Sequence, residues 1–289
     1  MNYYGQWSNV IRVKPGSGET VYDVMYRALL IGESNYAGNK ALKGPVNDMN
    51  AMSGMLRGLN RPFSVKTLPN SKRKAILDAI RSTYADAMDN DVSLFYYSGH
   101  GVNAGGDDTY QGTLVPVDEN YITMKELAAE LSKVRGRVVV ILDSCMSGAA
   151  IESNSAQSEA DAFLESAEEA FSGYWLEEDT DVVPGMRMGE FRKSKFIVIT
   201  AASAYASSYE GKFDGSGTAQ GAFTAALIKG MGCKYPKGAY SGSMPADSDG
   251  NKQVTLYEIF CYARDQASNW AGQTARYYGP NDEILFRRK

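Results

Sequence analysis

The sequence has few of the residues on which catalytic and metal sites often depend: one histidine and three cysteines among 289 residues. Any mechanism with an imidazole base must therefore use His100. Three cysteines are too few for a disulfide framework, and no C-x-x-C or H-x-x-x-H spacing indicates structural zinc. No apolar run reaches the roughly 18 residues of a membrane span, and residues 1–18 lack the apolar core of a signal peptide. We therefore expect a cytoplasmic protein with no membrane partner.

Basic charge is also scarce. The chain carries 30 basic and 34 acidic residues, a formal net charge of -4, and its pI is near 5.3. Basic residues cluster in short runs, such as Lys72–Lys74 and Arg192–Lys193, and no run is longer than three residues. Binding to a phosphate backbone needs clustered cations, so no nucleic-acid partner is expected. The hydrophobic fraction of 44% is ordinary for a globular protein, and we expect a single domain over 1–289.

Short apolar runs alternate with amphipathic stretches along most of the chain. This pattern is typical of a mostly parallel sheet covered by helices. Four apolar runs predict buried strands: Tyr26–Ile31, Val92–Tyr97, Arg137–Leu142 and Phe196–Thr200. The more polar run Phe63–Leu68 predicts a strand near an edge of the sheet, and Glu283–Phe286 is a candidate for a last strand.

Helical spacing and capping signals place helices between these strands. The predicted helices are Asn47–Leu59, Ser71–Asn90, Thr123–Val134, Gln220–Met231 and Thr255–Trp270. Asn47 or Asp48 and Ser71 are candidate N-caps, and Thr123 with Glu126 fits a capping box. Residues 152–181 hold ten acidic residues and no basic ones, so we expect a solvated acidic linker over 152–195, with a short helix around Asp161–Phe171 as its candidate ordered part. Residues 1–25 are expected to be an N-terminal extension.

Two predicted strands end in reactive side chains. Ser98-Gly-His100-Gly101 follows one strand, and Asp143-Ser-Cys145 follows the next. A helix connects them, so the strands should be parallel and both ends should meet at one sheet edge, where sites form in α/β folds. Gly99 and Gly101 are expected to let the backbone turn sharply near a substrate. A buried, unreactive cysteine and a structural histidine remain the alternative interpretation.

The segments YYSGHG and LDSCMSG, with Cys145 45 positions after His100, resemble the caspase-like cysteine peptidases of the bacterial and metacaspase branch. The resemblance extends from about residue 26 to residue 286, through Leu42–Met52 and the run AASAYASSYE at 201–210. It implies a caspase-like three-layer sandwich, with a mostly parallel sheet of about six strands and helices on both faces. The chain departs from metacaspases at Pro45, where cysteine is frequent, and at Met146.

The resemblance implies a cysteine endopeptidase. Cys145 would be the nucleophile, His100 the general acid/base, and the backbone N–H groups of Gly101 and Cys145 the oxyanion donors. A group that orients the imidazole is not identifiable from the sequence. No cofactor is required for this chemistry, although calcium activates many metacaspases. A non-hydrolytic binding or scaffold module and an unrelated small-molecule hydrolase remain alternatives.

Carboxylates near the dyad predict specificity. Asp143 lies two residues before Cys145, and in the metacaspase pattern Asp48 and Ser98 line the same pocket. Together they predict an S1 pocket for Arg or Lys, so protein or peptide substrates with Arg or Lys at P1 are the expected partners. We also expect Asp48→Ala to lower kcat/KM far more than stability. Asp48 as a helix N-cap and Asp143 as a structural hydrogen-bond acceptor remain alternatives.

Two further segments carry specific expectations. Asp247, Asp249, Asn251, Thr255 and Glu258 have the spacing of oxygen ligands in an EF-hand-type loop, although Lys252 stands where that loop prefers glycine. Two interpretations of this segment remain open: a calcium site, or a plain loop that leads to the N-cap Thr255.

Arg187 is the first basic residue after Cys145, so it is the predicted self-cleavage site of an Arg/Lys-specific enzyme. The sequence leaves the oligomeric state open.

Overall fold

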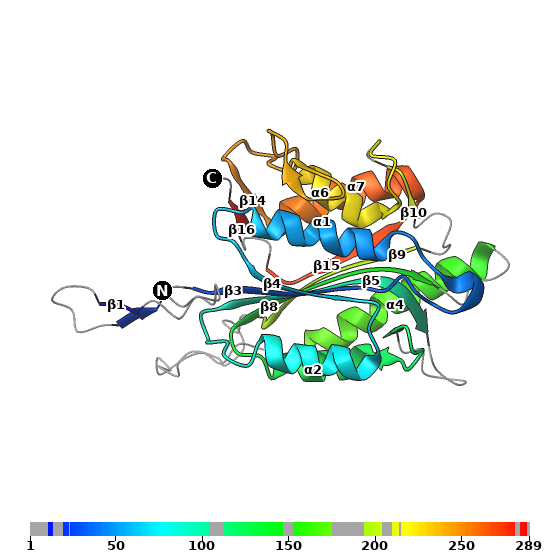
Figure 1. Ribbon diagram of the computed structural model, residues 1–289, viewed down its shortest axis with the longest axis horizontal. Helices are drawn as coiled ribbons and strands as arrows, with labels where there is room; N and C mark the ends of the chain where they lie inside the picture. The colour runs from blue at the N-terminus through cyan, green and yellow to red at the C-terminus, as the bar shows by residue number, and fades with distance from the viewer. Residues whose placement is uncertain are drawn as a thin grey trace, which may run out of the picture.

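The structure is a computed structural model that describes residues 11–13, 20–22, 24–103, 112–146, 153–174, 194–203, 210–213, 215–280 and 284–287. Its main body has three layers, a sheet seen edge-on between two layers of helices (Figure 1). None of the helices in these ranges has the length and apolar character needed to cross a membrane. A separate antiparallel hairpin of β1 (Ile11–Val13) and β2 (Thr20–Tyr22) precedes this body.

The central sheet has six strands in its main path, in the order β4-β3-β5-β8-β9-β15, and the first five are parallel. This confirms the predicted fold class. The strands are β3 (Tyr26–Gly32), β4 (Ser64–Pro69), β5 (Val92–Asn103), β8 (Arg137–Met146), β9 (Phe196–Ser203) and the antiparallel β15 (Thr274–Tyr278). β6 (Gly112–Leu114) and β7 (Ile122–Thr123) extend it beside the end of β5. As predicted, the polar strand β4 lies at an edge.

The remaining strands form small pairs outside the central sheet. They are β10 (Glu210–Gly211) with β11 (Gln220–Gly221), β12 (Cys233–Lys234) with β13 (Ala239–Tyr240), and β14 (Gln253–Thr255) with β16 (Ile284–Arg287). The C-terminal run is thus a strand, but it pairs with β14. β15 closes the central sheet instead, and the sequence analysis did not identify it.

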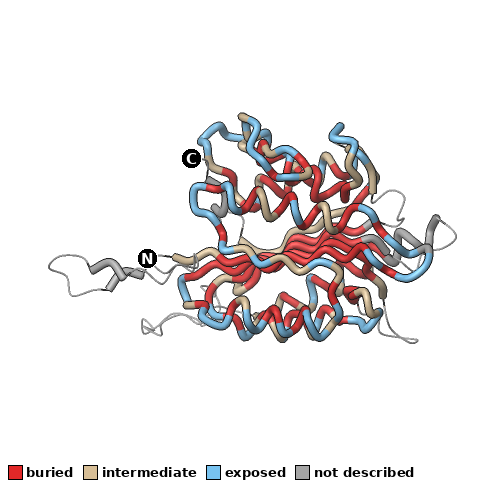
Figure 2. Tube along the Cα trace, in the orientation of Figure 1, coloured by how far each residue is buried: buried red, intermediate tan, exposed pale blue. Residues whose placement is uncertain are grey.

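Helices cover both faces of the sheet, and the sheet itself is the most buried part of the molecule (Figures 1 and 2). One apolar cluster joins the sheet to α1 (Pro45–Arg57), α6 (Ala222–Gly230) and α7 (Leu256–Ala271). The other joins it to α2 (Arg73–Thr83), α3 (Met124–Ser132) and α4 (Ser153–Ser172). Successive strand residues alternate between the two clusters: Tyr96 contacts the first, and Phe95 and Tyr97 the second. A short 3-10 turn, η1 (Gly38–Lys40), follows β3.

Two of the predicted N-caps are wrong. α1 begins at Pro45, whose missing N–H suits a first helical position, so Gly44 is the N-cap and Asp48 lies inside the first turn. Lys72, not Ser71, precedes α2. Thr123 does cap α3 by accepting the Glu126 N–H, and Thr255 caps α7 in a complete capping box.

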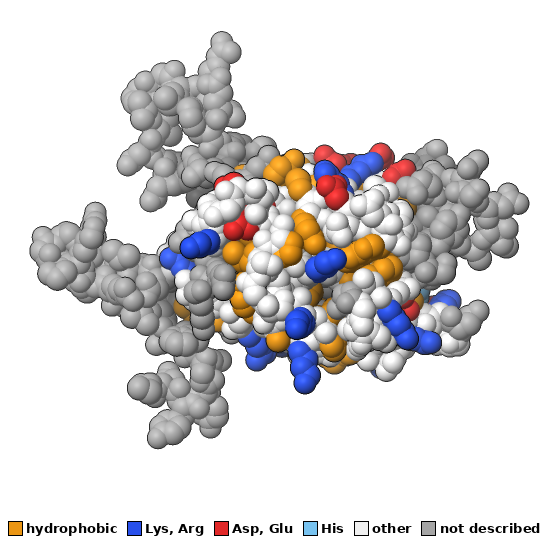
Figure 3. All heavy atoms as spheres, turned by 90° about the horizontal axis from the view of Figure 1, so that it is seen from above, with side chains coloured by type: hydrophobic (Ala, Val, Ile, Leu, Met, Phe, Trp, Pro, Cys, Tyr) orange, Lys and Arg blue, Asp and Glu red, His pale blue; other side chains and the backbone are white. Residues whose placement is uncertain are grey.

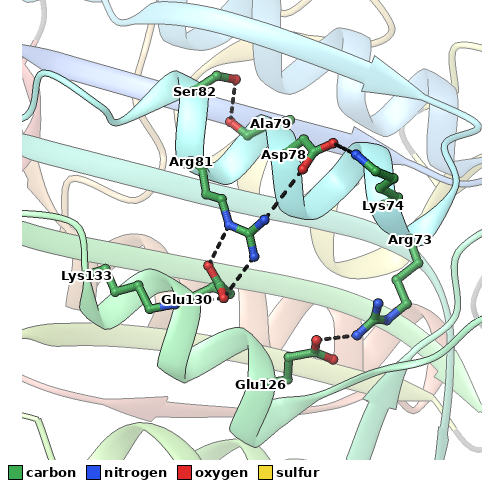
Figure 4. Close-up of polar contacts among 9 residues, drawn as sticks. All are labelled: Arg73, Lys74, Asp78, Ala79, Arg81, Ser82, Glu126, Glu130 and Lys133. Atoms are coloured by element: carbon green, nitrogen blue, oxygen red, sulfur yellow. Dashed lines mark hydrogen bonds and ion pairs between the residues drawn. The ribbon is translucent and has the colours of Figure 1, made fainter.

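Glu126 has another role, because its carboxylate pairs with Arg73 of α2 (Figure 4). Farther along the same two helices, Arg81 donates from Nε and Nη2 to the carboxylate of Glu130, each at 3.1 Å. These ion pairs join α2 to α3 on the outer surface.

The acidic stretch differs most from the expectation. Residues 153–172 form the 20-residue helix α4, and Phe163, Leu164, Ala167 and Phe171 on it are fully buried against the sheet. The prediction of a solvated linker is therefore wrong for this part, because apolar residues at helical spacing let an acidic helix bury one face.

Candidate active site

The register of two central strands brings the two predicted catalytic positions together. β5 and β8 are parallel neighbours, and His100 pairs with Cys145 while Ser98 pairs with Asp143. Both pairs lie at the carboxyl ends of the strands, as the sequence predicts. Their adjacency is a property of the sheet backbone, so it does not depend on a loop conformation.

The His100 ring is held from two sides. Its Nε2 lies 2.7 Å from the carbonyl oxygen of Lys40 in η1, and its ring centroid lies 4.3 Å from that of Tyr36. A carbonyl oxygen can only accept, so Nε2 must carry a hydrogen and the neutral ring has its lone pair at Nδ1. Lys40 therefore supplies the orienting group that the sequence analysis did not identify. Because this group is a backbone atom, no side-chain pattern announces it.

A hydroxyl from Tyr36 also holds the backbone of His100. The His100 N–H donates to this hydroxyl at 2.9 Å, and the hydroxyl donates to the carbonyl oxygen of Val115 at 2.8 Å. Tyr97 donates to the same carbonyl at 2.9 Å. The site histidine is only 4% exposed, and burial lowers its pKa more than the hydrogen bond to Lys40 raises it. The ring is thus poised as a neutral base.

The two glycines beside His100 do not make the expected sharp turn, because β5 stays extended to Asn103. They are needed for packing instead. A Cβ on Gly99 would lie 2.7 Å from the hydroxyls of Tyr36 and Tyr97, and a Cβ on Gly101 would lie 2.9 Å from the ring of Phe163. The role of the Gly101 N–H as an oxyanion donor remains a prediction.

Asp48 on α1 is hydrogen-bonded to Ser98, which lies two residues before His100 on β5. Ser98 Oγ donates to Asp48 Oδ2 at 2.9 Å, and the Tyr235 hydroxyl donates to Oδ1 at 2.8 Å. The Gly221 N–H donates to both carboxylate oxygens, at 3.0 and 3.1 Å. Asp48 is fully buried, so burial, together with the charge of nearby Asp143, raises its pKa well above the ordinary value. The predicted S1 residues Asp48 and Ser98 are therefore in direct contact.

Asp143 is also fully buried and accepts from two other elements. The Thr224 N–H and hydroxyl donate to Oδ2 at 2.9 and 2.6 Å, and Gln273 Nε2 donates to Oδ1 at 2.8 Å. Burial raises its pKa despite these hydrogen bonds. The backbone contact agrees with the structural alternative for Asp143, and its role in an S1 pocket remains a prediction.

Thr224, Tyr235 and Gln273 hold these carboxylates, and the sequence analysis did not identify them. Each is more than 80 residues away in sequence from the aspartate it contacts. No local motif marks such partners, so only the folded chain could reveal them.

The other two cysteines lie on different elements from the dyad positions, Cys233 on β12 and Cys261 on α7. Cys233 lines a cavity of about 400 Å³ between the last turn of α1 and the β12–β13 pair, together with Met55, Met231 and Met244. Burial raises the pKa of its thiol to about 11, which disfavours the thiolate. The view onto the α1, α6 and α7 face shows hydrophobic side chains with Lys and Arg among them (Figure 3).

The candidate calcium loop gathers oxygen atoms at the surface. Among the described residues, Asp247, Asp249 and Glu258 have ligand atoms within 4.8 Å of one another. Lys252 adopts a φ of 65°, the left-handed conformation that favours glycine. The Glu258 carboxylate already accepts from Thr255 and Ser248. Calcium binding therefore remains a prediction. The predicted self-cleavage site, Arg187, lies outside the described residues.

Comparisons with known proteins agree on one family. The family model of the caspase domain matches residues 25–266. Metacaspase-1 of Schizosaccharomyces pombe is 31% identical over 147 residues, which cover 44% of this chain and 35% of the relative. Metacaspase-1 of Candida albicans is 34% identical over 152 residues, which cover 44% and 34%. The chain thus spans about a third of the length of these curated relatives.

A solved structure supports the fold independently. The crystal structure of a protein from Geobacter sulfurreducens superposes with a TM-score of 0.54 and covers 91% of this chain and 97% of its own. Its sequence identity is 20%, so the likeness concerns the fold alone.

Proposed function

Because the chain belongs to the caspase-domain family of cysteine-type endopeptidases, we propose that it hydrolyses peptide bonds after Arg or Lys. The observation that carries this proposal is the pairing of His100 with Cys145 at the carboxyl ends of β5 and β8. The oriented ring of His100 adds to it, because the tautomer with a lone pair at Nδ1 is the one that a base needs.

In this mechanism His100 Nδ1 takes the proton of the Cys145 thiol. The thiolate attacks the carbonyl carbon of the scissile bond, and the negative oxygen receives hydrogen bonds from the N–H groups of Gly101 and Cys145. The C–N bond then breaks, and the leaving amine takes the proton from His100. Water, deprotonated by the same ring, hydrolyses the thioester and restores the thiol. No metal or cofactor is needed for these steps.

The charge of the buried carboxylates supports the choice of Arg or Lys at P1. Asp48 in the first turn of α1 and Asp143 at the end of β8 are both fully buried, and the charge of Asp143 helps to raise the pKa of Asp48. Two buried carboxyl groups that repel each other favour the binding of a cation, because a substrate charge would offset their mutual repulsion. Ser98, which donates to Asp48 and pairs with Asp143 in the sheet register, completes the proposed S1 pocket.

A fluorogenic peptide panel that varies at P1 tests this proposal. We expect cleavage after Arg and Lys by the wild type, and none by Cys145→Ala or His100→Ala. Cys233→Ala and Cys261→Ala are the matched controls, and they should retain activity. Efficient cleavage after Asp or a bulky apolar residue would refute the specificity. No turnover on any peptide would favour a binding or scaffold module.

Calcium and self-processing are parts of the same proposal. The panel is run with and without calcium, and calcium-dependent turnover would support an activating site. Self-cleavage after Arg187 would give two fragments, which intact-mass analysis of the wild type would detect after incubation. Equal processing of Cys145→Ala would instead indicate a contaminating protease. The cytoplasm remains the predicted location, since three cysteines suit a reducing compartment.

A further inference from the structure

Gln273 carries a half-paired amide at the candidate site. It lies between α7 and β15 and is only 1% exposed. Its Nε2 donates to Asp143 Oδ1 at 2.8 Å, but its Oε1 has no hydrogen-bond partner among the described residues. Buried polar atoms are nearly always paired, so an unpaired acceptor beside a functional carboxylate calls for an explanation.

The sheet register explains how Gln273 reaches Asp143. Gln273 directly precedes Thr274, which pairs with Ala202 on β9, while Asp143 on β8 pairs with Ala201. The side chain therefore crosses β9 where that strand has small residues. Its amide ends beside the strand terminus that carries Cys145, two residues after Asp143.

The chemistry of the two groups defines the ligand. A carbonyl oxygen and a carboxylate are both acceptors, so together they attract a cation with several N–H donors and repel an anion. The other contacts of Asp143 come from Thr224, whose N–H and hydroxyl both donate to Oδ2. Gln273 also contacts Asp143, and its Oε1 is an acceptor that a ligand could use.

We infer that Gln273 determines specificity in the S1 pocket: Nε2 holds Asp143, and Oε1 accepts an N–H from the Arg or Lys side chain at P1. This inference rests on the proposed cleavage after Arg or Lys. The planar guanidinium can reach both acceptors at once, so Arg gains more from Gln273 than Lys does.

The first test compares kcat/KM on peptides with Arg, Lys or citrulline at P1. Gln273→Met keeps the length of the side chain but removes both polar atoms, and Gln266→Met on α7 is the matched control. We expect the preference for Arg over citrulline to fall about tenfold to a hundredfold in Gln273→Met and to stay unchanged in the control. Equal losses on all three peptides would show a structural role only and overturn the inference.

A second test separates this inference from catalysis. Calorimetry measures the binding of agmatine, a guanidinium compound, to Cys145→Ala with and without Gln273→Met. We expect binding to weaken at least tenfold, and an unchanged Kd would refute the role of Gln273. If agmatine binds neither protein, both this inference and the Arg/Lys preference fail. Cys145-dependent cleavage after neutral residues would still support the peptidase.

Gln273→Glu serves if the methionine variant does not fold. A glutamic acid can donate to Asp143 only while it is protonated. Once ionised, it adds a second negative charge beside Asp143, which attracts a cation more strongly. We therefore expect the preference of Gln273→Glu for Arg over citrulline, relative to the wild type at each pH, to rise as the pH rises. A ratio that does not change with pH would contradict the placement of this side chain beside the P1 cation.

Discussion

Replacing Asp48 by alanine would remove a carboxylate that accepts hydrogen bonds from three donors in separate parts of the chain. These donors are the Ser98 hydroxyl on β5, the Gly221 N–H on β11 and the Tyr235 hydroxyl. All three are buried, and each buried donor left without a partner costs about 1–3 kcal/mol. Allowing for water in the space that the side chain leaves, we expect unfolding free energy to fall by roughly 3–6 kcal/mol.

That loss is large beside the ~5–15 kcal/mol that stabilise a typical domain. It changes the expectation from the sequence that Asp48→Ala would spare stability, because the side chain anchors α1 to the sheet and to β11. Urea unfolding of the inactive Cys145→Ala protein, with and without Asp48→Ala, measures the cost. A difference below about 1 kcal/mol would refute the hydrogen-bond accounting.

Asp48→Asn separates charge from anchoring. The amide keeps one acceptor oxygen and the shape of the side chain, and it carries no charge to bury beside Asp143. We expect unfolding free energy to change by only about 1–2 kcal/mol. Loss of the charge partner should cost about 2–5 kcal/mol of transition-state binding to Arg peptides, so kcat/KM should fall roughly thirtyfold to several thousandfold. An Asn variant that still prefers Arg over citrulline would refute the S1 role of Asp48.

Three other predictions concern the surroundings of the base. Tyr36→Phe removes the acceptor of the His100 N–H, while the Val115 carbonyl keeps Tyr97, so steady-state assays should show kcat about tenfold lower with KM little changed. Because burial lowers the pKa of His100, the acid limb of kcat/KM should lie below the ordinary value of 6.5, and a limb above it would contradict the neutral-base geometry. Burial raises the pKa of Glu33 from 4.5 to about 8, so the folded protein keeps a proton that the unfolded chain releases. The wild type should therefore lose stability as pH rises from 4.5 through 8. The Tm of Glu33→Gln should therefore rise relative to the Tm of the wild type as the pH increases over that range. A Tm difference that stays constant with pH would contradict the raised pKa of Glu33.

The sequence by itself determined the parallel core and the two catalytic candidates. Strands buried on both faces need nearly continuous apolar residues, so Val92–Tyr97 and Arg137–Leu142 were recognisable without any long-range information. Because a helix separates these strands, the chain had to run them parallel, and their reactive residues had to meet at one edge. The caps at Thr123 and Thr255 were also local, since each side chain bonds a backbone group three residues away.

Only the tertiary structure decided what surrounds those candidates. The carbonyl of Lys40 orients His100 from 60 residues away, and Gln273 reaches Asp143 from 130 residues away. The acidic composition of 153–172 concealed α4, because the sheet supplies the apolar surface on which its few hydrophobic residues are buried. β15 was concealed because its residues are all partly exposed and show no period-two alternation of burial. Packing against distant segments, which local patterns do not encode, fixes these features.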